Sequence, residues 1–159
     1  MKDVVLFAFS TSSSAATIPV TLKTANQDLG VNQNVASFVV PVGATINMDG
    51  TAIMQGLATV FIAQMSGIDL TLFQYMQVVL LAVATSIGTA AVPSAGTITL
   101  IIILQQFNLP LEAIGIILAV DRVLDMIRTS VNVTGDAAIA CIVAKTENQL
   151  DENIFNSKA

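Results

Sequence analysis

Residues 85–96, which read TSIGTAAVPSAG, interrupt an apolar segment where a plain membrane-spanning helix would continue with Leu and Ile. The chain is apolar through residues 78–84 before this stretch, and it becomes apolar again from Ile98 to Gln106. Neither apolar arm has the ~20 residues that a full span of the bilayer needs. Residues 70–106 are therefore predicted to form a re-entrant helical hairpin whose tip lies near the middle of a membrane.

Other segments of the chain are broken in a similar way. Residues 10–27 begin with a serine-rich tip and are predicted to continue as the second arm of a first hairpin. Residues 32–66 are predicted to form a helix that is interrupted at 47–51, and residues 110–145 a long last helix. Paired tips and an unwound helix are typical of inverted-repeat transporters, which build a binding site at the membrane midplane.

The composition favours an all-α membrane protein. Of the 159 residues, 54% are hydrophobic and 11% are charged, and the mean hydropathy is +0.78. No Lys or Arg lies between Thr24 and Asp121, which argues against a nucleic-acid partner. The chain has one Cys and no His, so zinc sites and Ser-His catalysis lack their usual residues. We therefore expect a membrane protein without a zinc site or Ser-His catalysis.

The distribution of lysines predicts the orientation in the cell membrane. If both ends of the chain are cytoplasmic, the cytoplasmic side carries Lys2, Lys23, Lys145 and Lys158. The opposite loops carry no Lys or Arg, in agreement with the positive-inside rule. We expect a multi-pass protein of the cell membrane with a polar cytoplasmic tail at 147–159.

A regular pattern of polar residues marks the last predicted helix. Separations of four, three, four and four positions join Asp121, Asp125, Arg128, Asn132 and Asp136. At about 100° per residue they fall within an arc of about 80°, so they form one face of the helix. Ionisable side chains within a membrane are costly and usually mark functional sites. The alternative is that Asp125 and Arg128 merely pair with each other, as acids and bases three positions apart often do.

The chemistry of this polar face matches an acidic amino acid. The planar guanidinium of Arg128 suits a carboxylate, and Asp125 suits an ammonium group. Neutral hydrogen bonds are available from Asn132 and Thr129. Because the acids outnumber this arginine, bound cations or protons must compensate the charge. Oxygen atoms that suit sodium are present on Asp136, Asn132 and Asn47, while protonation stays an alternative on charge alone.

Four motifs follow one another along the chain. They are NMDGT at 47–51, SIGTAAVP at 86–93, DRVLDMIRT at 121–129 and NVTGD at 132–136. In their sequence and order they resemble the dicarboxylate/amino acid:cation symporter family, which includes archaeal sodium-aspartate transporters and animal excitatory amino acid transporters. The match covers nearly the whole chain.

The resemblance implies an elevator mechanism. In this family a mobile transport domain of two re-entrant hairpins and two helices slides across the bilayer within the fixed scaffold of a homotrimer. Residues 1–146 would be the C-terminal portion of that transport domain. The chain would lack the first arm of the first hairpin, the scaffold helices and the trimer interface, so we expect it to bind poorly and not to transport on its own.

The resemblance also assigns substrate contacts to individual residues. The side-chain carboxylate of aspartate or glutamate would lie on Arg128, and the α-carboxylate on Asn132. The α-ammonium would lie on Asp125 and Thr129. The rest of the pocket would be lined by Thr51 and by the backbones at Ser14 and Val92.

Sodium sites follow from the same resemblance. One site would use the carbonyls of Gly43 and Asn47 together with the Asp136 carboxylate. A second would use carbonyls near Thr45, Ser86, Ile87 and Thr89. A third would involve Asp49 and Asn47. Gln55 replaces a glutamate of the proton- and potassium-coupled animal members, which implies coupling to sodium alone.

Several alternatives stay open. An intramembrane aspartyl protease would use Asp49 and an aspartate of the last helix as a dyad. A channel-like or purely structural bundle would use the small residues for close helix packing. Within the family, proton- or sodium-coupled carriers of C4-dicarboxylates or neutral amino acids are further alternatives. The presence of both Arg128 and Asp125 favours aspartate or glutamate as the substrate over C4-dicarboxylates and neutral amino acids.

Overall fold

The computed structural model describes residues 1–157, and this part of the chain folds into helices joined by turns, which confirms the predicted all-α class. The elements are α1 (Lys2–Thr11), α2 (Ser14–Gln27), α3 (Gln33–Ile46), α4 (Asp49–Met65), α5 (Leu72–Ile87), α6 (Ala95–Gln106), the 3-10 turn η1 (Leu111–Ala113), α7 (Ile114–Thr146) and α8 (Glu152–Ser157). Residues 158 and 159 of the predicted polar tail, including Lys158, lie outside the described residues.

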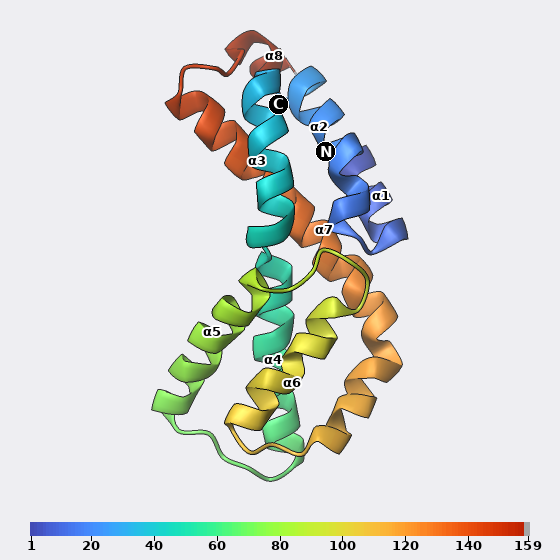
Figure 1. The fold of residues 1–159 in the computed structure, drawn as a ribbon, viewed down its shortest axis with the longest axis vertical. Helices are drawn as coiled ribbons and strands as arrows, with labels where there is room; N and C mark the ends of the chain where they lie inside the picture. Colours follow the sequence, from blue (N-terminus) through green and yellow to red (C-terminus); the bar gives the residue numbers. More distant parts are fainter. Residues whose placement is uncertain (158–159) are drawn as a thin grey trace.

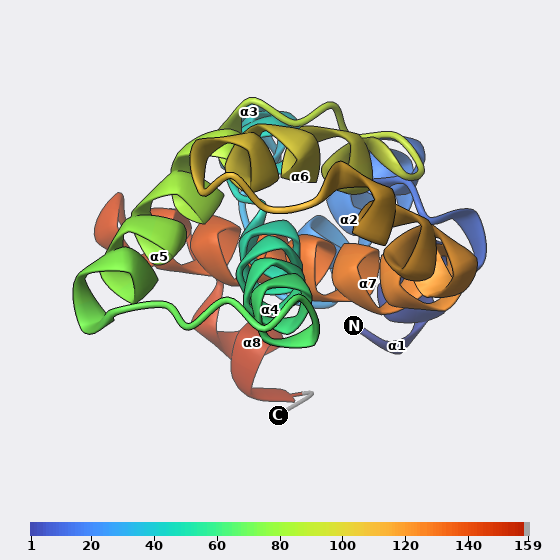
Figure 2. The ribbon, with the colours of Figure 1, turned by 90° about the horizontal axis from the view of Figure 1, so that it is seen from below.

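The molecule is elongated, and α7 runs along most of its length (Figure 1). Helices α1, α2 and α3 pack against the C-terminal half of α7, while α4 and α6 pack against its N-terminal half. Seen from below, α4, α6 and α7 lie together and α5 extends to one side (Figure 2). The breaks between α1 and α2, between α3 and α4 and between α5 and α6 lie near the middle of the molecule, whereas the other turns lie toward its two ends (Figure 1).

The first break separates α1 from α2. Ser12 adopts a left-handed conformation with φ 51°, and the Ser13 side chain caps α2 by accepting a 3.2 Å hydrogen bond from the Ala16 amide. Residues 2–11, where the chain was expected to lack a first arm, form a helix. This helix is stabilised by tertiary packing, because Val4 and Ala8 share one helix face and are fully buried against Val133 of α7.

The second break separates α3 from α4 and falls within the predicted interruption. α3 ends at Ile46 and α4 begins at Asp49. The backbone N–H of Gly50, which has no partner inside its own helix, donates a 2.8 Å hydrogen bond to Asn132 Oδ1. A Cβ atom at Gly50 would lie 3.1 Å from the carbonyl carbon of Arg128. Glycine thus allows the start of α4 to approach the backbone of α7 closely.

The third break, residues 88–94, separates α5 from α6. α5 begins at a capping box of Thr71 and Gln74 and ends at Ile87. Beyond the break, Ser94 has a left-handed conformation with φ 60° and precedes α6. A core of buried apolar residues joins this helical hairpin to α4 and α7, with Ile62, Leu100, Ile103 and Leu104 at its centre.

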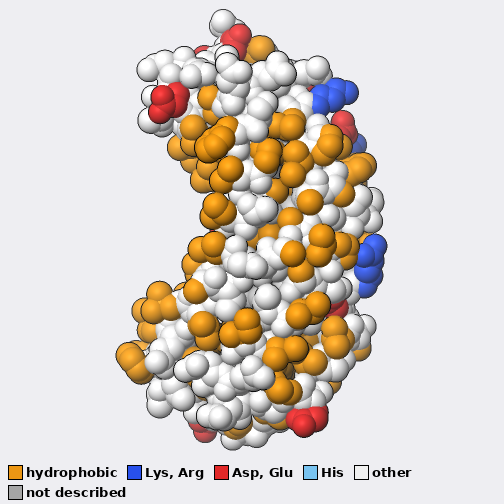
Figure 3. All heavy atoms as spheres, viewed as in Figure 1, with side chains coloured by type: hydrophobic (Ala, Val, Ile, Leu, Met, Phe, Trp, Pro, Cys, Tyr) orange, Lys and Arg blue, Asp and Glu red, His pale blue; other side chains and the backbone are white. Residues whose placement is uncertain are grey.

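The surface is unusually apolar. Large side chains such as Phe38, Leu72 and Phe73 are more than 70% exposed. In Figure 3 hydrophobic side chains spread over the visible face, whereas charged ones lie at the two ends and along one edge. None of the helices in residues 1–157 is both long enough and apolar enough to qualify as a membrane crossing.

Candidate functional site

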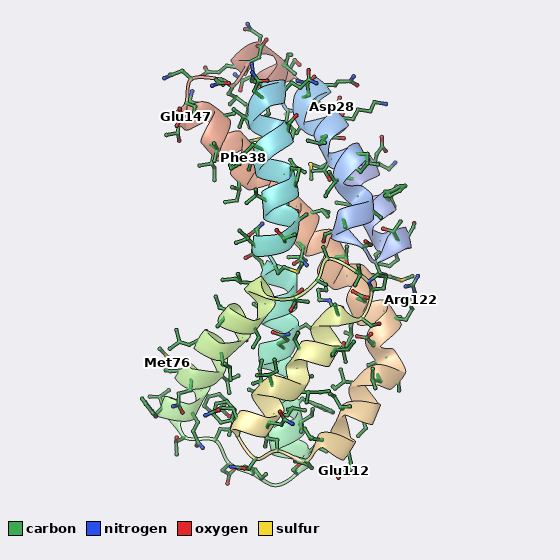
Figure 4. The ribbon with its side chains drawn as sticks, in the orientation of Figure 1. Asp28, Phe38, Met76, Glu112, Arg122 and Glu147 are labelled. Carbon is green, nitrogen blue, oxygen red and sulfur yellow. The ribbon has the colours of Figure 1, made fainter. Side chains whose placement is uncertain are left out.

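The polar face of α7 is buried at the centre of the molecule. Relative exposure is between 1% and 5% for Asp121, Asp125, Arg128, Asn132 and Asp136. By contrast, Arg122 is exposed and points outward from α7 (Figure 4). The spacing of the sequence therefore identified the inward face of the helix.

Arg128 and Asp125 form a buried ion pair. Nη2 and Nε of Arg128 lie 2.6 Å and 3.2 Å from Asp125 Oδ1. The other oxygen, Oδ2, accepts a 2.7 Å hydrogen bond from the backbone N–H of Ser94. The pairing that the sequence left open as an alternative is thus present, and it also ties the 88–94 loop to α7. The third guanidinium nitrogen, Nη1, is buried and has no hydrogen-bond partner among the described residues.

A small cavity lies beside this ion pair. Its volume is about 10 Å³, close to the minimum that holds one water molecule. The structure brings together around it all the residues that were predicted to bind substrate, namely Ser14, Thr51, Val92, Asp125, Arg128, Thr129 and Asn132. They come from α2, α4, the 88–94 loop and α7, so the cavity lies where the helix breaks meet.

Asn132 is held by the start of α4. Its Nδ2 donates a 3.2 Å hydrogen bond to Thr51 Oγ1, while its Oδ1 accepts from the Gly50 backbone N–H. Thr129 lies one turn before it on α7, with Oγ1 3.4 Å from Asp125 Oδ1. The residues around the cavity therefore offer a cation, an acid, an amide and several hydroxyl groups.

Sequence reasoning did not assign five residues of the cavity wall to a site, namely Ser12, Met48, Ala90, Ala91 and Gly96. Ser12 lines it next to Ser14, and Gly96 lies directly against the guanidinium. A Cβ atom at Gly96 would lie 2.9 Å from both Arg128 Cζ and Thr51 Cγ2. The glycine in the 85–96 stretch was the available signal, since glycine often marks a close approach of backbone to another group.

Several of the predicted sodium ligands gather around the break between α3 and α4. Asp136 Oδ1 accepts a 3.1 Å hydrogen bond from Asn47 Nδ2. A Cβ atom at Gly43 would lie 2.6 Å from the same carboxylate oxygen, and one at Gly135 would lie 3.0 Å from Asp49 Oδ2. Asp136 is buried, yet neither ion pair of the described residues includes it.

This donor set fits sodium. Carboxylate, amide and backbone carbonyl oxygens are ligands of hard cations, and a buried carboxylate needs a compensating charge. Within residues 1–157, no group of three or more His, Cys, Asp and Glu side chains is arranged for a metal ion. A cation at Asp136 would therefore rely on backbone and amide oxygens for most of its ligands.

The residues predicted to bind the second sodium ion are not linked to one another by hydrogen bonds among the described residues. α3, which carries Thr45, contacts α5, which carries Ser86 and Ile87. However, the side chains of Thr45 and Ser86 bond to carbonyls of their own helices, and no hydrogen bond of the described residues links Thr45 to Ser86, Ile87 or Thr89. Thr89 instead pairs with Thr99 at 3.0 Å.

Gln55 connects α4 to both arms of the neighbouring helical hairpin. Its Nε2 donates to Gly96 O at 3.0 Å and to Thr99 Oγ1 at 2.7 Å, and its Oε1 accepts from Thr85 Oγ1 at 2.9 Å. The side chain is fully buried. An amide, which both donates and accepts, satisfies this arrangement without carrying charge.

Comparison with known proteins gives consistent matches. The sodium:dicarboxylate symporter family matches residues 1–146. The chain is 50% identical over 136 residues to an excitatory amino acid transporter of Caenorhabditis elegans, covering 86% of this chain and 27% of that protein. It is 48% identical over 159 residues to excitatory amino acid transporter 3 of Mus musculus, covering 99% of this chain and 30% of that protein. For excitatory amino acid transporter 2 of Homo sapiens the identity is 50% over 136 residues, with coverages of 86% and 24%. The chain thus spans less than a third of the length of these relatives.

Proposed function

Because the chain belongs to the sodium:dicarboxylate symporter family, we propose that the complete protein carries aspartate or glutamate across the cell membrane together with sodium. Arg128 binds the side-chain carboxylate, Asn132 the α-carboxylate, and Asp125 with Thr129 the α-ammonium. Thr51 and the backbones at Ser14 and Val92 complete the pocket. The names of the relatives, which are excitatory amino acid transporters, support this substrate class.

One observation carries the substrate assignment. Arg128 is buried beside a cavity, and its Nη1 has no hydrogen-bond partner within residues 1–157. A buried guanidinium nitrogen without a partner is costly, and an anionic ligand group would satisfy it. A carrier of neutral amino acids has no need for this arrangement, and a C4-dicarboxylate carrier has no need for Asp125 beside it.

Sodium has a structural role in this proposal as well as an energetic one. Gly43, Asn47 and Asp136 hold one ion, carbonyls near Thr45, Ser86, Ile87 and Thr89 hold a second, and Asp49 with Asn47 takes part in a third. Asn132, which lies one helical turn before Asp136 on α7, provides a further oxygen for sodium. A bound cation offsets the cost of burying the Asp136 carboxylate, so ion binding and closure of the site favour each other.

The arrangement in the membrane is also part of the proposal. α2 is the second arm of the first re-entrant hairpin, α5 and α6 form the second hairpin, and the whole unit moves as the transport domain of a multi-pass homotrimer. The large exposed apolar side chains support contact with lipid or with apolar scaffold helices. Membership in a symporter family weighs against the aspartyl protease hypothesis.

The test is uptake of aspartate into proteoliposomes that contain the complete protein. We expect uptake to require an inward sodium gradient and to be lost in Arg128→Ser. Arg122→Ser is the matched control, because Arg122 lies on the same helix but is exposed. Truncating one partner of a buried charged contact weakens binding by about 30-fold or more. Unchanged aspartate selectivity in Arg128→Ser would reject the assignment.

A further inference from the structure

The segment after α7 folds back onto the turn between α2 and α3. Val31 of this turn and Leu150 face each other in an antiparallel bridge. Val31 belongs to a buried apolar cluster with Ala25 of α2 and Ala144 of α7, and Leu150 packs against this cluster. Residues 149–151, called the strap below, therefore join the end of α2 to the end of α7.

Two backbone hydrogen bonds fix the strap to the turn. The N–H of Asn32 donates to Gln149 O at 3.0 Å. On the other side of the bridge, the N–H of Asp151 donates to Gly30 O at 2.8 Å. Gly30 has a positive φ of 71°, and a Cβ atom there would lie 2.5 Å from Asp151 O. Only glycine therefore lets the strap lie this close to the turn.

The packing of α2 gives a reason for such a fastening. The buried residues of α2 are Ser14, Thr17, Thr21, Thr24 and Ala25, so four of the five carry a hydroxyl group. The hydroxyls of Thr17 and Thr21 donate to backbone carbonyls four positions earlier in the chain, at 2.8 and 3.2 Å, and so bond along α2 itself. Burial of apolar area is the main favourable term in helix packing. These side chains add little of it between α2 and α7.

We propose that the strap is a conformational device that keeps the start of α2 in place beside the cavity. Although α2 contains Pro19, it is one continuous helix from Ser14 to Gln27. Fixing its last turn therefore restricts its first turn, where Ser14 lines the cavity. The strap acts whether or not a ligand is bound, so this inference goes beyond the proposed function. Releasing the strap should let α2 move away from α7 and open the cavity at the first helix break.

The first test uses Gly30→Ala in the complete protein, with Gly67→Ala as the matched control. The added Cβ atom at Gly30 would overlap the Asp151 carbonyl and displace the strap. Gly67 also has a positive φ, 67°, but a Cβ atom there would meet nothing within 4 Å. Both variants carry a similar backbone strain, and only the first disturbs the strap.

Hydrogen exchange without substrate is the measurement. In Gly30→Ala we expect the amides of residues 15–24 to exchange severalfold faster than in the unsubstituted protein, because α2 opens locally more often. In Gly67→Ala these amides should keep their rates, and exchange at 88–94 should be the same in both variants. An equal increase at 15–24 in the two variants, or no increase in either, would overturn the inference.

A disulfide across the bridge gives the opposite test. Residues 31 and 150 form a non-hydrogen-bonded pair, in which Cα atoms typically lie about 4.5 Å apart, a separation that a disulfide can join. The variant is Val31→Cys/Leu150→Cys, combined with Cys141→Ala because Cys141 lies beside Leu150. The oxidised form should exchange more slowly at 15–24 than the reduced form of the same variant.

Comparing two redox forms of one variant removes the effect of the substitutions themselves. Equal exchange at 15–24 in the two forms, or failure of the disulfide to form, would overturn the inference. Failure of the unsubstituted protein to bind aspartate would reject the proposed function but not the strap, because the exchange measurements need no ligand.

Discussion

The two helix breaks that close the cavity, Ser12–Ser13 and residues 88–94, are built differently. The first is short, and both of its serines are buried. The second is longer, and much of it is exposed, with Val92 at 52%. The first break is packed between α1, α2 and α7, whereas the second is fixed to its surroundings by a small number of polar contacts.

The difference indicates which break opens when substrate enters. A cavity of about 10 Å³ cannot hold an amino acid, so part of its wall has to move. Moving 88–94 requires loss of the Ser94 to Asp125 hydrogen bond and of the contacts that Ser13 and Ala15 make with Ala91 O. Moving the first break would instead expose fully buried apolar side chains on α1. We therefore expect 88–94 to open and the first break to stay in place.

Residues 88–94 are called the mobile break below. The largest effect is expected at Gly96, the second residue of α6, just after this break. In Gly96→Ala the added Cβ atom would overlap the Arg128 guanidinium and lie 2.9 Å from Thr51 Cγ2, so the guanidinium has to move. We expect aspartate affinity to fall by more than tenfold, which competition binding would measure.

Gly115→Ala is the control for this substitution. Gly115 lies on α7, and a Cβ atom there would meet nothing within 4 Å. Alanine in a helix interior is favoured over glycine by about 1 kcal/mol, so this variant should keep full affinity and normal or higher stability. Equal affinity for aspartate in the two variants would show that Gly96 does not set the position of Arg128.

A smaller effect is expected from Gln55→Leu, which tests how the mobile break is held at its base. The change removes hydrogen bonds to Gly96, Thr85 and Thr99, on both arms of the hairpin. At about 1 kcal/mol for each bond, the protein should lose roughly 2 to 4 kcal/mol of stability. Hydrogen exchange at 88–94 should become faster.

Gln64→Leu provides the comparison, because Gln64 is an exposed glutamine on the same helix. It should leave both stability and exchange unchanged. If Gln55→Leu unfolds at a lower temperature but exchange at 88–94 keeps its rate, then Gln55 supports the core and has no part in holding the mobile break.

How much of this could be predicted from sequence depends on whether a feature is local. The breaks could be placed because Gly, Pro and Ser interrupt apolar runs, and the polar face of α7 followed from spacing alone. The helical state of residues 2–11 could not be predicted in this way, because Val4 and Ala8 are buried against Val133, which is far away in the sequence. The pair of Arg128 and Asp125 is local, three positions apart on one helix, and its spacing gave it as an alternative. The hydrogen bonds of Gln55, in contrast, depend on how the helices pack.

The smallest effect is expected from Ser13→Ala, which acts on the contact between the two breaks. Ser13 Oγ accepts from the Ala16 amide as the cap of α2 and donates to Ala91 O in the mobile break. Loss of the cap should cost about 1 kcal/mol of stability. Loss of the second bond leaves the Ala15 amide, at 3.3 Å, as the remaining donor to Ala91 O.

The two consequences of Ser13→Ala can be separated by hydrogen exchange in the absence of substrate. If 88–94 is the part that moves, its amides should exchange severalfold faster, while those of α1 and α2 beyond the first turn keep their rates. Ser10→Ala should change neither segment, because that exposed hydroxyl bonds only within α1. Faster exchange throughout α1 and α2 with no change at 88–94 would reverse the comparison, because the first break would then be the one that opens.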